Sequence, residues 1–286
     1  MAKMKSLQKM KTVQLFSGRS VPVLGQGTWE MGEDSTKRKE EIEALRVGVE
    51  LGMSLIDTAE LYGNGASEEL ISEALGNQRK EVFLCSKVLP DHASLKGTIQ
   101  ACENSLRRLR TDYLDLYLLH WKGSIPLDET LEAFQYLKQA GKILDYGVSN
   151  FDVDDMEEAI SLPGGDEIAT NQVLYNLMRR GIEWDLIPLC QERKMPIMAY
   201  SPIERGSLLS NSVLKAIASR HSVTPSQIAL AWVLRQKGVI AIPKASKPEH
   251  VIENRAALEI KLTEEDLREL DQAFPPPKRK VALEII

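Results

Sequence analysis

The feature that most constrains this fold is an alternation of short apolar runs with longer segments of helical periodicity. Each apolar run is too short for a stable helix and is typical of a strand that is buried on both faces. Strands that alternate with helices favour a parallel sheet covered by those helices. The strands are predicted at 23–27, 54–58, 82–87, 114–120, 143–149, 168–173, 196–201 and 239–244.

Helical segments separate these runs. In the first of them Ile42, Leu45 and Val49 fall on one face, which is the spacing of an amphipathic helix. Ser67 precedes two glutamates and is predicted to be the N-cap of the second helix, and Thr263 begins the last helix with a capping-box pattern. The predicted helices span 36–51, a segment starting at residue 67, 95–109, 129–140, 152–161, 184–193, 211–220, 225–236 and 263–273.

The order of these elements predicts an α/β fold, the (β/α)8 TIM barrel, in which eight parallel strands close on themselves. Residues 12–25 form two short apolar runs around a Gly-containing turn and predict an N-terminal β-hairpin that caps one end of the barrel. The alternative is an open doubly wound sheet, which usually carries GxGxxG after its first strand, whereas residues 25–29 read GQGTW. Since no break in composition divides the chain, one domain over 1–286 is expected, with the tail from Phe274 packed across the barrel.

Composition limits the classes of function. A formal net charge of −5 argues against nucleic-acid binding, which needs a basic surface. No segment reaches the roughly 18 apolar residues of a transmembrane helix, and the basic N-terminal stretch lacks the apolar region of a secretory signal. The three separated cysteines, Cys85, Cys102 and Cys190, lack metal-ligand spacing and are expected to be free thiols. A cytoplasmic location away from membranes is therefore expected.

Polar residues stand where the predicted strands end. In a (β/α)8 barrel the carboxyl ends of the strands build the site, so these side chains are expected at one rim. Asp57, Lys87 and His120 end the second, third and fourth strands, and Tyr62 lies in the turn after the second. The later strands end in Ser149-Asn150, Asn171-Gln172, Tyr200-Ser201 and Lys244. This convergence predicts a functional site.

Asp57, Tyr62, Lys87 and His120 together could transfer a proton. A phenol has a pKa of about 10 and is a poor acid at neutral pH, and a nearby ammonium is expected to lower the pKa of Tyr62. Asp57 would keep Lys87 charged, and His120 could hydrogen-bond a carbonyl and orient it. Each residue also has a structural alternative: Asp57 could cap a helix, Lys87 could form an ion pair, and His120 could be a core histidine.

Several blocks of the sequence resemble the aldo-keto reductase family. LIDTAELYG at 55–63 is similar to the family signature, and the resemblance extends from about Val21 to Leu270. Within the family the chain is most similar to bacterial members that reduce methylglyoxal, on GQGTW at 25–29, MGED at 31–34 and the Pro-Pro-Lys near the end. Further similar blocks are SKV at 86–88, LHW at 119–121, GVSNF at 147–151, NQV at 171–173, AYSP at 199–202 and IPK at 242–244.

The resemblance implies a nicotinamide cofactor, usually NADPH, that lies across the barrel rim and gives a hydride to a carbonyl carbon. It implies that Tyr62 protonates the oxygen, with Lys87 and Asp57 tuning the tyrosine and His120 positioning the carbonyl. The carboxamide of the cofactor would be held by polar side chains, and a tyrosine would stack on the nicotinamide ring. The implied contacts at this end are Gly27, Thr28, Trp29, Asp57, Ser149, Asn150, Gln172, Tyr200, Ser201 and Ile203.

The segment that begins at Lys244 is implied to hold the adenosine end of NADPH. Its lysine and serine side chains and a helix N-terminus would meet the 2′-phosphate, and an acid–amide pair would contact the adenine. His250 stands where many relatives have an arginine, and an imidazole lacks the bidentate fork of a guanidinium. NADPH is therefore the expected cofactor, with NADH possible at a weaker preference. The implied contacts are Lys244, Ala245, Ser246, His250, Glu253 and Asn254.

The substrate is expected to contact Trp29, Tyr62, His120 and Trp121. Short loops and a short tail imply an open pocket for small carbonyl compounds such as methylglyoxal, and the family resemblance implies a monomer. One alternative is an NADPH-binding regulatory or redox-sensing barrel with little turnover. Another is a metal-dependent barrel hydrolase, which needs clustered ligands; of the four histidines only His120 ends a predicted strand, and no metal site is expected.

Overall fold

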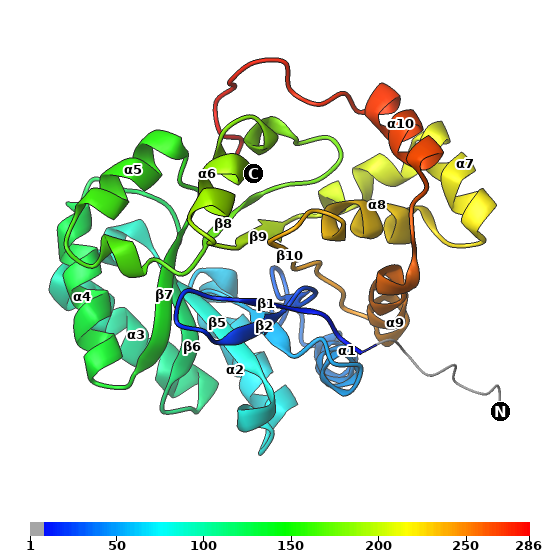
Figure 1. Cartoon of the computed structure of the whole chain (residues 1–286). Helices are drawn as coiled ribbons and strands as arrows, with labels where there is room; N and C mark the ends of the chain where they lie inside the picture. The colour runs from blue at the N-terminus through cyan, green and yellow to red at the C-terminus, as the bar shows by residue number, and fades with distance from the viewer. Residues whose placement is uncertain (1–8) are drawn as a thin grey trace.

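The structure, a computed structural model, describes residues 9–286 and contains a closed parallel barrel (Figure 1). Strands β3 to β10 neighbour one another in the order in which they occur along the chain. Bridges between Leu24 and Ala241 and between Gly27 and Lys244 join the first of these strands to the last. The strands are β3 (Gln26–Gly27), β4 (Leu55–Asp57), β5 (Phe83–Val88), β6 (Leu114–Leu119), β7 (Ile143–Ser149), β8 (Asn171–Leu174), β9 (Ile197–Tyr200) and β10 (Val239–Ala241).

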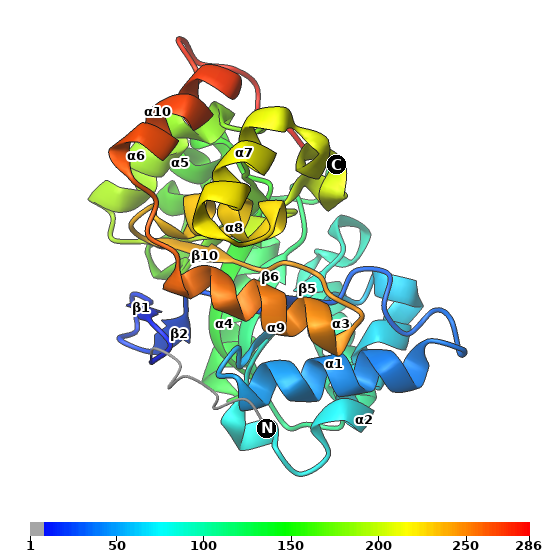
Figure 2. The same ribbon diagram turned by 90° about the vertical axis from the view of Figure 1, so that its right-hand side faces the viewer.

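The predicted (β/α)8 barrel is thereby confirmed. Helices lie around its outside, and two that are far apart in the sequence, α1 and α9, lie side by side where the barrel closes (Figure 2). The helices are α1 (Arg38–Glu50), α2 (Ala66–Leu75), α3 (Leu95–Leu109), α4 (Leu127–Gln139), α5 (Val153–Ser161), α6 (Leu186–Glu192), α7 (Ser212–His221), α8 (Pro225–Leu234), α9 (Pro248–Ala256) and α10 (Glu264–Ala273). Residues 1–8, which belong to the predicted domain and to the basic N-terminal stretch, lie outside the described residues.

Of the two helix N-caps predicted from the sequence, the structure confirms one and contradicts the other. The capping box before α10 is confirmed, because the Thr263 hydroxyl accepts a hydrogen bond from the backbone N–H of Asp266 at 3.1 Å. The prediction that Ser67 caps α2 is wrong. The N-cap is Gly65, with a φ of 94° that favours glycine, and Ser67 lies inside the helix, where its hydroxyl donates to Thr28 Oγ1 at 2.8 Å. Ser67 therefore attaches α2 to the loop after β3.

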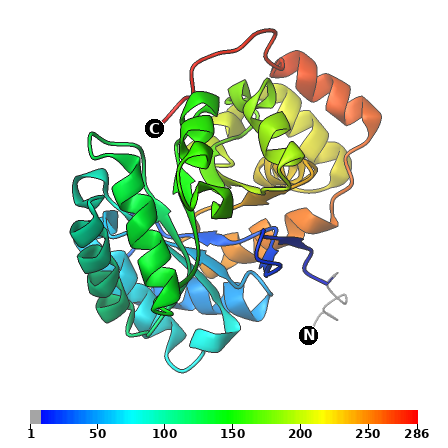
Figure 3. The same ribbon diagram turned by 60° about the vertical axis from the view of Figure 1, so that its left-hand side comes forward.

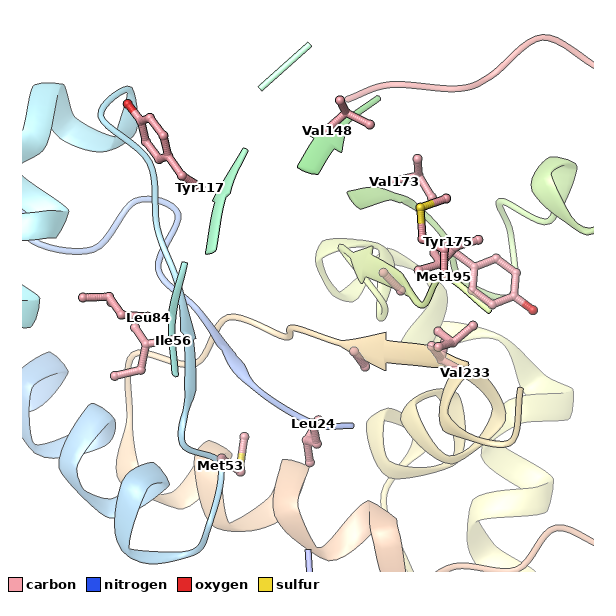
Figure 4. Close-up of a cluster of buried hydrophobic side chains, with 14 of the residues drawn as sticks. Leu24, Met53, Ile56, Leu84, Tyr117, Val148, Val173, Tyr175, Met195 and Val233 are labelled. Carbon is pink, nitrogen blue, oxygen red and sulfur yellow. The ribbon is translucent and has the colours of Figure 1, made fainter. Parts of the chain in front are cut away.

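The strands separate two apolar layers, which explains why they read as continuous apolar runs. Every residue of β5 and β6 is buried. Successive residues of a strand face opposite sides, so Phe83 and Cys85 belong to the cluster inside the barrel while Leu84 belongs to the larger cluster between strands and helices. Figure 4 shows part of that larger cluster, in which Ile56 and Leu84 lie close together on neighbouring strands.

A β-hairpin closes the amino end of the barrel. Strands β1 (Thr12–Gln14) and β2 (Ser20–Pro22) pair antiparallel. Leu15, which follows β1, and Val21 of β2 pack into the interior cluster. Arg19 donates to Asp115 on β6 at 2.6 Å and lies 3.5 Å from Asp145 on β7. These contacts confirm the predicted hairpin cap and leave the carboxyl ends of the strands accessible.

The tail, residues 274–286, crosses the barrel from α10 towards α5 and α6 (Figures 1 and 3). At its start the guanidinium of Arg180 donates to the carbonyl of Phe274 at 2.6 Å. Further along, Lys280 lies 3.2 Å from Asp154 on α5. The expectation that the tail packs across the barrel is therefore confirmed. Within residues 9–286, no helix combines the length and the apolar character needed to cross a membrane.

Candidate active site

A cavity of about 680 Å³ opens at the carboxyl ends of the strands. Of the residues that the sequence assigned to the site, Lys87 alone does not line it, because its side chain is fully buried behind the cavity wall. The assigned residues that do line the cavity are Gly27, Thr28, Trp29, Asp57, Tyr62, His120, Trp121, Ser149, Asn150, Gln172, Tyr200, Ser201, Ile203, Lys244, Ala245, Ser246, His250, Glu253 and Asn254. The structure thus brings together residues from every part of the barrel rim.

Lys87 is the centre of the innermost group of side chains. Its ammonium donates to Asp57 Oδ2 at 2.8 Å, to the carbonyl of Thr58 at 2.8 Å and to the Tyr62 hydroxyl at 3.2 Å. All three N–H donors are therefore used. The register of the barrel explains the meeting, because Asp57 ends β4 beside Cys85, and Lys87 follows two residues later on β5. Lys87 and Asp57 thus form a buried ion pair, and the Tyr62 hydroxyl is hydrogen-bonded to its ammonium.

A tight turn delivers Tyr62 to this group. The tyrosine begins a short 3-10 segment, η1 (Tyr62–Gly65), in which Gly63, Asn64 and Gly65 have φ values of 56°, 51° and 94°. Such left-handed conformations reverse the chain within a few residues and favour glycine or asparagine. The ring of Tyr62 is buried, with the edge-on ring of Trp29 at a centroid distance of 5.0 Å. The turn thus aims the phenol hydroxyl back over the end of β5.

Burial sets the protonation state of this group. It raises the pKa of Tyr62 above the ordinary value of a phenol, while the Lys87 ammonium acts in the opposite direction. The predicted net lowering of the Tyr62 pKa is therefore wrong, although the lysine acts with the expected sign. Burial alone would lower the pKa of Lys87, but the neighbouring acidic groups, Asp57 foremost and Tyr62 and Cys85 beside it, together outweigh burial and raise the pKa. At neutral pH the site holds a neutral phenol against a charged ammonium.

His120 follows β6 and faces the same space. Its ring lies 5.8 Å from that of Tyr62 and 4.9 Å from that of Trp121, between centroids. Burial and the charge of Lys87 lower the pKa of His120 from 6.5 to about 3, so the imidazole is neutral at neutral pH. Its buried Nδ1 has no hydrogen-bond partner among the described residues. A neutral imidazole beside a protonated phenol is suited to hydrogen-bonding a polar atom that enters the cavity.

Polar residues at or near the carboxyl ends of β7 and β9, together with Gln172 within β8, form a hydrogen-bonded chain connected to Asp57. Gln172 Nε2 donates to Asp57 Oδ1 at 2.7 Å. The Ser149 hydroxyl donates to the carbonyl of Gln172 at 2.8 Å, and the Tyr200 hydroxyl donates to Asn150 Oδ1 at 2.9 Å. Sequence reasoning placed these residues at one rim but could not find their mutual bonds. Asp57 thus accepts from Lys87 through one oxygen and from Gln172 through the other.

The far end of the cavity has a different character. Lys244 and Lys247 are exposed there, and helix α9 begins at Pro248, so cationic side chains and a helix N-terminus lie together. Glu253 on this helix accepts from the hydroxyl of Ser226 at 2.6 Å, and His250 lies 3.6 Å from the same carboxylate. A positive helix terminus with nearby lysines favours a phosphate group.

Several cavity-lining residues were not found from the sequence, and two of the segments that carry them are neither strand nor α-helix. The first is the segment 201–209, here named the rim segment, which contributes Pro202, Arg205, Gly206 and Leu209 besides the predicted residues. The second is the end of the tail, which contributes Ile285 and Ile286. Positive φ values at Glu204 and Arg205 turn the backbone of the rim segment, and no pattern in the sequence predicts this turn. The prediction of an open pocket, which was based on short loops and a short tail, also did not include Ile285 and Ile286 as cavity-lining residues.

An α/β barrel that brings a tyrosine, a lysine, an aspartate and a neutral histidine to one elongated cavity belongs to the class of barrel oxidoreductases. Among residues 9–286, no three His, Cys, Asp or Glu side chains group closely enough to hold a metal ion. Residues 23–274 match the model of the Aldo/keto reductase family. The chain belongs to this family, and the family expected from the sequence is confirmed.

Similar proteins support the same assignment over nearly the whole length. The chain is 52% identical to the methylglyoxal reductase YeaE of Escherichia coli, over 97% of this chain and 100% of that protein. It is 35% identical to the glyoxal reductase of Bacillus subtilis, over 91% of each chain. A crystal structure of an aldo-keto reductase from Klebsiella pneumoniae in complex with NADPH superimposes with a TM-score of 0.95 at 48% identity, covering 98% of this chain and 100% of that one.

Proposed function

We propose that this protein reduces small aldehydes and ketones to alcohols with NADPH, and that methylglyoxal is among its substrates. The observation that carries the proposal is the contact between Lys87 and Tyr62, 3.2 Å apart beside the neutral ring of His120. Family membership and the names of the similar reductases support the reaction class. NADPH, when bound, supplies the hydride that the carbonyl carbon receives.

The described residues account for the proton and for the position of the carbonyl. The neutral ring of His120 donates a hydrogen bond to the carbonyl oxygen and holds it near the Tyr62 hydroxyl. Tyr62 gives its proton to that oxygen as negative charge develops on it. The Lys87 ammonium stabilises the phenolate that remains, and Asp57 keeps the lysine charged and oriented. Tyr62 is thus the proposed acid, and the other three residues set its environment.

The cavity fits an extended dinucleotide, because its two ends differ as the two ends of NADPH do. Near Tyr62, the amide and hydroxyl groups of Ser149, Asn150 and Gln172 can hold the carboxamide. Tyr200 is half-buried and is placed to stack on the nicotinamide ring. The residues proposed to contact the rest of the cofactor are Gly27, Thr28, Trp29, Asp57, Ser201, Ile203, Lys244, Ala245, Ser246, His250, Glu253 and Asn254.

The cationic far end of the cavity supports a preference for NADPH over NADH. Lys244 and Ser246 line it beside the start of α9, and the additional phosphate of NADPH would gain their hydrogen bonds. His250 adds less than an arginine would, because it lacks the guanidinium fork. We expect fluorescence titrations to give tighter binding of NADPH than of NADH, by a factor that shrinks as salt is added. Equal or tighter binding of NADH would contradict this assignment.

Apolar side chains at the inner end of the cavity support a small substrate. Trp29 and Trp121 flank Tyr62 and His120, and the two isoleucines at the end of the tail, 285 and 286, lie on the same cavity. Such walls leave room for a compact carbonyl compound. Steady-state kinetics over a panel of carbonyls should rank small aldehydes above steroids. A steroid preferred by orders of magnitude would overturn the proposal on substrate size.

The competing function is an NADPH-binding regulatory barrel with little turnover, and Tyr62→Phe separates the two. The variant removes the proposed acid and keeps the ring, so kcat should fall at least about a hundredfold while NADPH affinity stays within about twofold. Tyr117→Phe is the matched control, because it removes a buried hydroxyl that has no partner among the described residues. Near-normal turnover by Tyr62→Phe would contradict the role of Tyr62 as the acid, and no turnover by the wild type would favour the regulatory function.

We also infer that the whole chain forms one domain, acts as a cytoplasmic monomer and binds neither nucleic acid nor membranes. The continuous barrel and the tail that crosses it support the single domain. The net charge of −5 supports the absence of nucleic-acid binding. Size-exclusion chromatography with light scattering should give the mass of one chain, 32.0 kDa. A mass twice as large would refute the monomer.

A further inference from the structure

Two walls of the cavity come from segments that are far apart in the sequence. The rim segment, 201–209, follows β9 on the side proposed to hold the cofactor. The end of the tail lines the same cavity with Ile285 and Ile286, and the backbone of Ile286 lies beside Tyr200. Neither wall belongs to a strand or to an α-helix. What holds them in place therefore matters for both ligands.

One side chain outside the cavity contacts both walls. Arg179 lies in the loop after β8, and its Nε donates to Glu204 Oε1 of the rim segment at 3.0 Å. Its Nη1 donates to Glu284 Oε1 of the tail at 2.5 Å. Glu284 directly precedes the two isoleucines that line the cavity. The planar guanidinium of Arg179 thus bridges the two carboxylates.

The loop that carries Arg179 is itself fixed to the rim segment. Asn176 Oδ1 accepts from the backbone N–H of Arg179 at 3.1 Å, which closes the turn. The side-chain amide of the same asparagine donates to Glu204 Oε2 at 2.6 Å and to the carbonyl of Ser201 at 2.9 Å. Glu204 is buried, so its carboxylate depends on these donors.

The backbone conformation of the rim segment explains why these contacts are needed. Ser201, Glu204 and Arg205 have φ values of 46°, 47° and 50°, in the left-handed region that residues with a Cβ avoid. Such conformations persist when surrounding contacts impose them. Here the contacts come from Asn176 and Arg179, and the arginine extends the same constraint to the tail.

We propose that Arg179 is a positioning residue that couples the rim segment to the end of the tail, so that ordering of the rim segment by NADPH also fixes the apolar wall formed by Ile285 and Ile286. The proposal rests on the proposed function for the identity of the two ligands. Arg179 does not line the cavity and acts through Glu204 and Glu284. Its effect is therefore expected on the KM of the carbonyl more than on kcat.

Limited digestion with trypsin tests the coupling without turnover. Lys278, Arg279 and Lys280 lie in the tail, so trypsin removes the last residues when the tail leaves the barrel, and intact-mass spectrometry follows the loss. In the wild type, saturating NADPH should slow this cleavage several-fold. In Arg179→Met cleavage should be faster, and NADPH should no longer slow it.

Two further variants distinguish the contact of Arg179 with the rim segment from the attachment of the tail to the barrel. Glu204→Gln removes the negative charge and one of the two acceptor oxygens, which weakens the contact of Arg179 with the rim segment. The tail should then be cleaved as in the wild type without NADPH, but the protection by NADPH should be lost. Asp154→Asn is the matched control, because it weakens the contact of the tail with α5 through Lys280 and leaves Arg179 untouched. Its tail should be cleaved faster, yet still be protected by NADPH.

Kinetics supply the second readout. Arg179→Met and Glu284→Gln should raise the KM of a small aldehyde several-fold and change kcat less than twofold, and Arg179→Lys should restore part of the loss. The coupling is refuted if NADPH binds Arg179→Met and protects its tail as in the wild type, or if KM does not change. A wild type whose tail is protected by NADPH but which reduces no carbonyl would refute the proposed function and leave the coupling intact.

Discussion

Lys87→Met is the substitution that most directly tests the proposed chemistry, because methionine fills the space of the lysine and removes the charge. The ammonium lies 3.2 Å from the Tyr62 hydroxyl. A unit charge at that distance contributes about 5 kcal/mol to a full phenolate at an effective dielectric constant of about 20. About half of the negative charge has formed when the barrier is crossed, so about 2.5 kcal/mol is lost. The expected fall in kcat is on the order of a hundredfold.

The assay is the steady-state consumption of NADPH at saturating aldehyde, together with urea unfolding. Lys87→Met leaves the buried carboxylate of Asp57 without its counter-charge, so the variant should also lose about 3–5 kcal/mol of unfolding free energy. The double variant Asp57→Asn/Lys87→Met removes both charges. It should regain most of the stability and none of the rate, because the phenolate still lacks its cation.

Two outcomes would refute this reasoning. If Lys87→Met keeps kcat within about threefold of the wild type, the ammonium does not stabilise the reacting phenol. If the double variant recovers the wild-type kcat, the single variant lost rate because of the uncompensated carboxylate and not because of the missing cation. The NADPH affinity of both variants should be measured, since Gln172 still donates to residue 57 and is expected to preserve cofactor binding.

Two further predictions concern stability. His120 has a pKa of about 3 in the folded protein and near 6.5 when unfolded, so between these values the unfolded chain binds the extra proton and stability falls by roughly 1.4 kcal/mol for each unit by which the pH is lowered; His120→Gln should flatten this slope in urea titrations at about pH 6 and 4, and an unchanged slope would contradict it. Arg19→Met should cost about 1–3 kcal/mol of unfolding free energy with kcat unchanged, because it removes the guanidinium that pairs with Asp115 and Asp145 at the end of the barrel opposite the site and leaves them only their other donors, among them Arg79 and Ser17; Arg38→Met, an exposed pair with Glu73, is the control and should cost less than about 1 kcal/mol, and equal losses would refute the role of the hairpin cap.

Much of the site could be predicted because a barrel converts sequence order into position. Once 54–58, 82–87 and 114–120 are recognised as neighbouring parallel strands, Asp57, Lys87 and His120 must lie at one rim, and the structure brings them there. The strands were recognisable because both of their faces are buried, which leaves an uninterrupted apolar run.

The remaining features depend on contacts that no local pattern encodes. Ser67 looks like an N-cap, but Gly65 takes that place and the serine bonds instead to Thr28, a residue 39 positions earlier. The direction of the Tyr62 pKa depends on how deeply the ring is buried, which a sequence does not reveal. The tail is a third case, because Ile285 and Ile286 at its end reach the cavity in a chain segment fixed by long-range contacts such as that between Arg179 and Glu284.

Asp57 restricts what any redesign of this barrel can change. Its two oxygens accept from Lys87 on one side and from Gln172 on the other, so this position requires a short side chain that accepts hydrogen bonds in both directions. Asparagine has the right shape, but beside an intact lysine and glutamine its amide must point a donor at a donor. An engineer who wishes to transplant this proton-transfer group into another barrel must therefore move residues 57, 87 and 172 as a unit, and leave the choice of substrate walls for a later step.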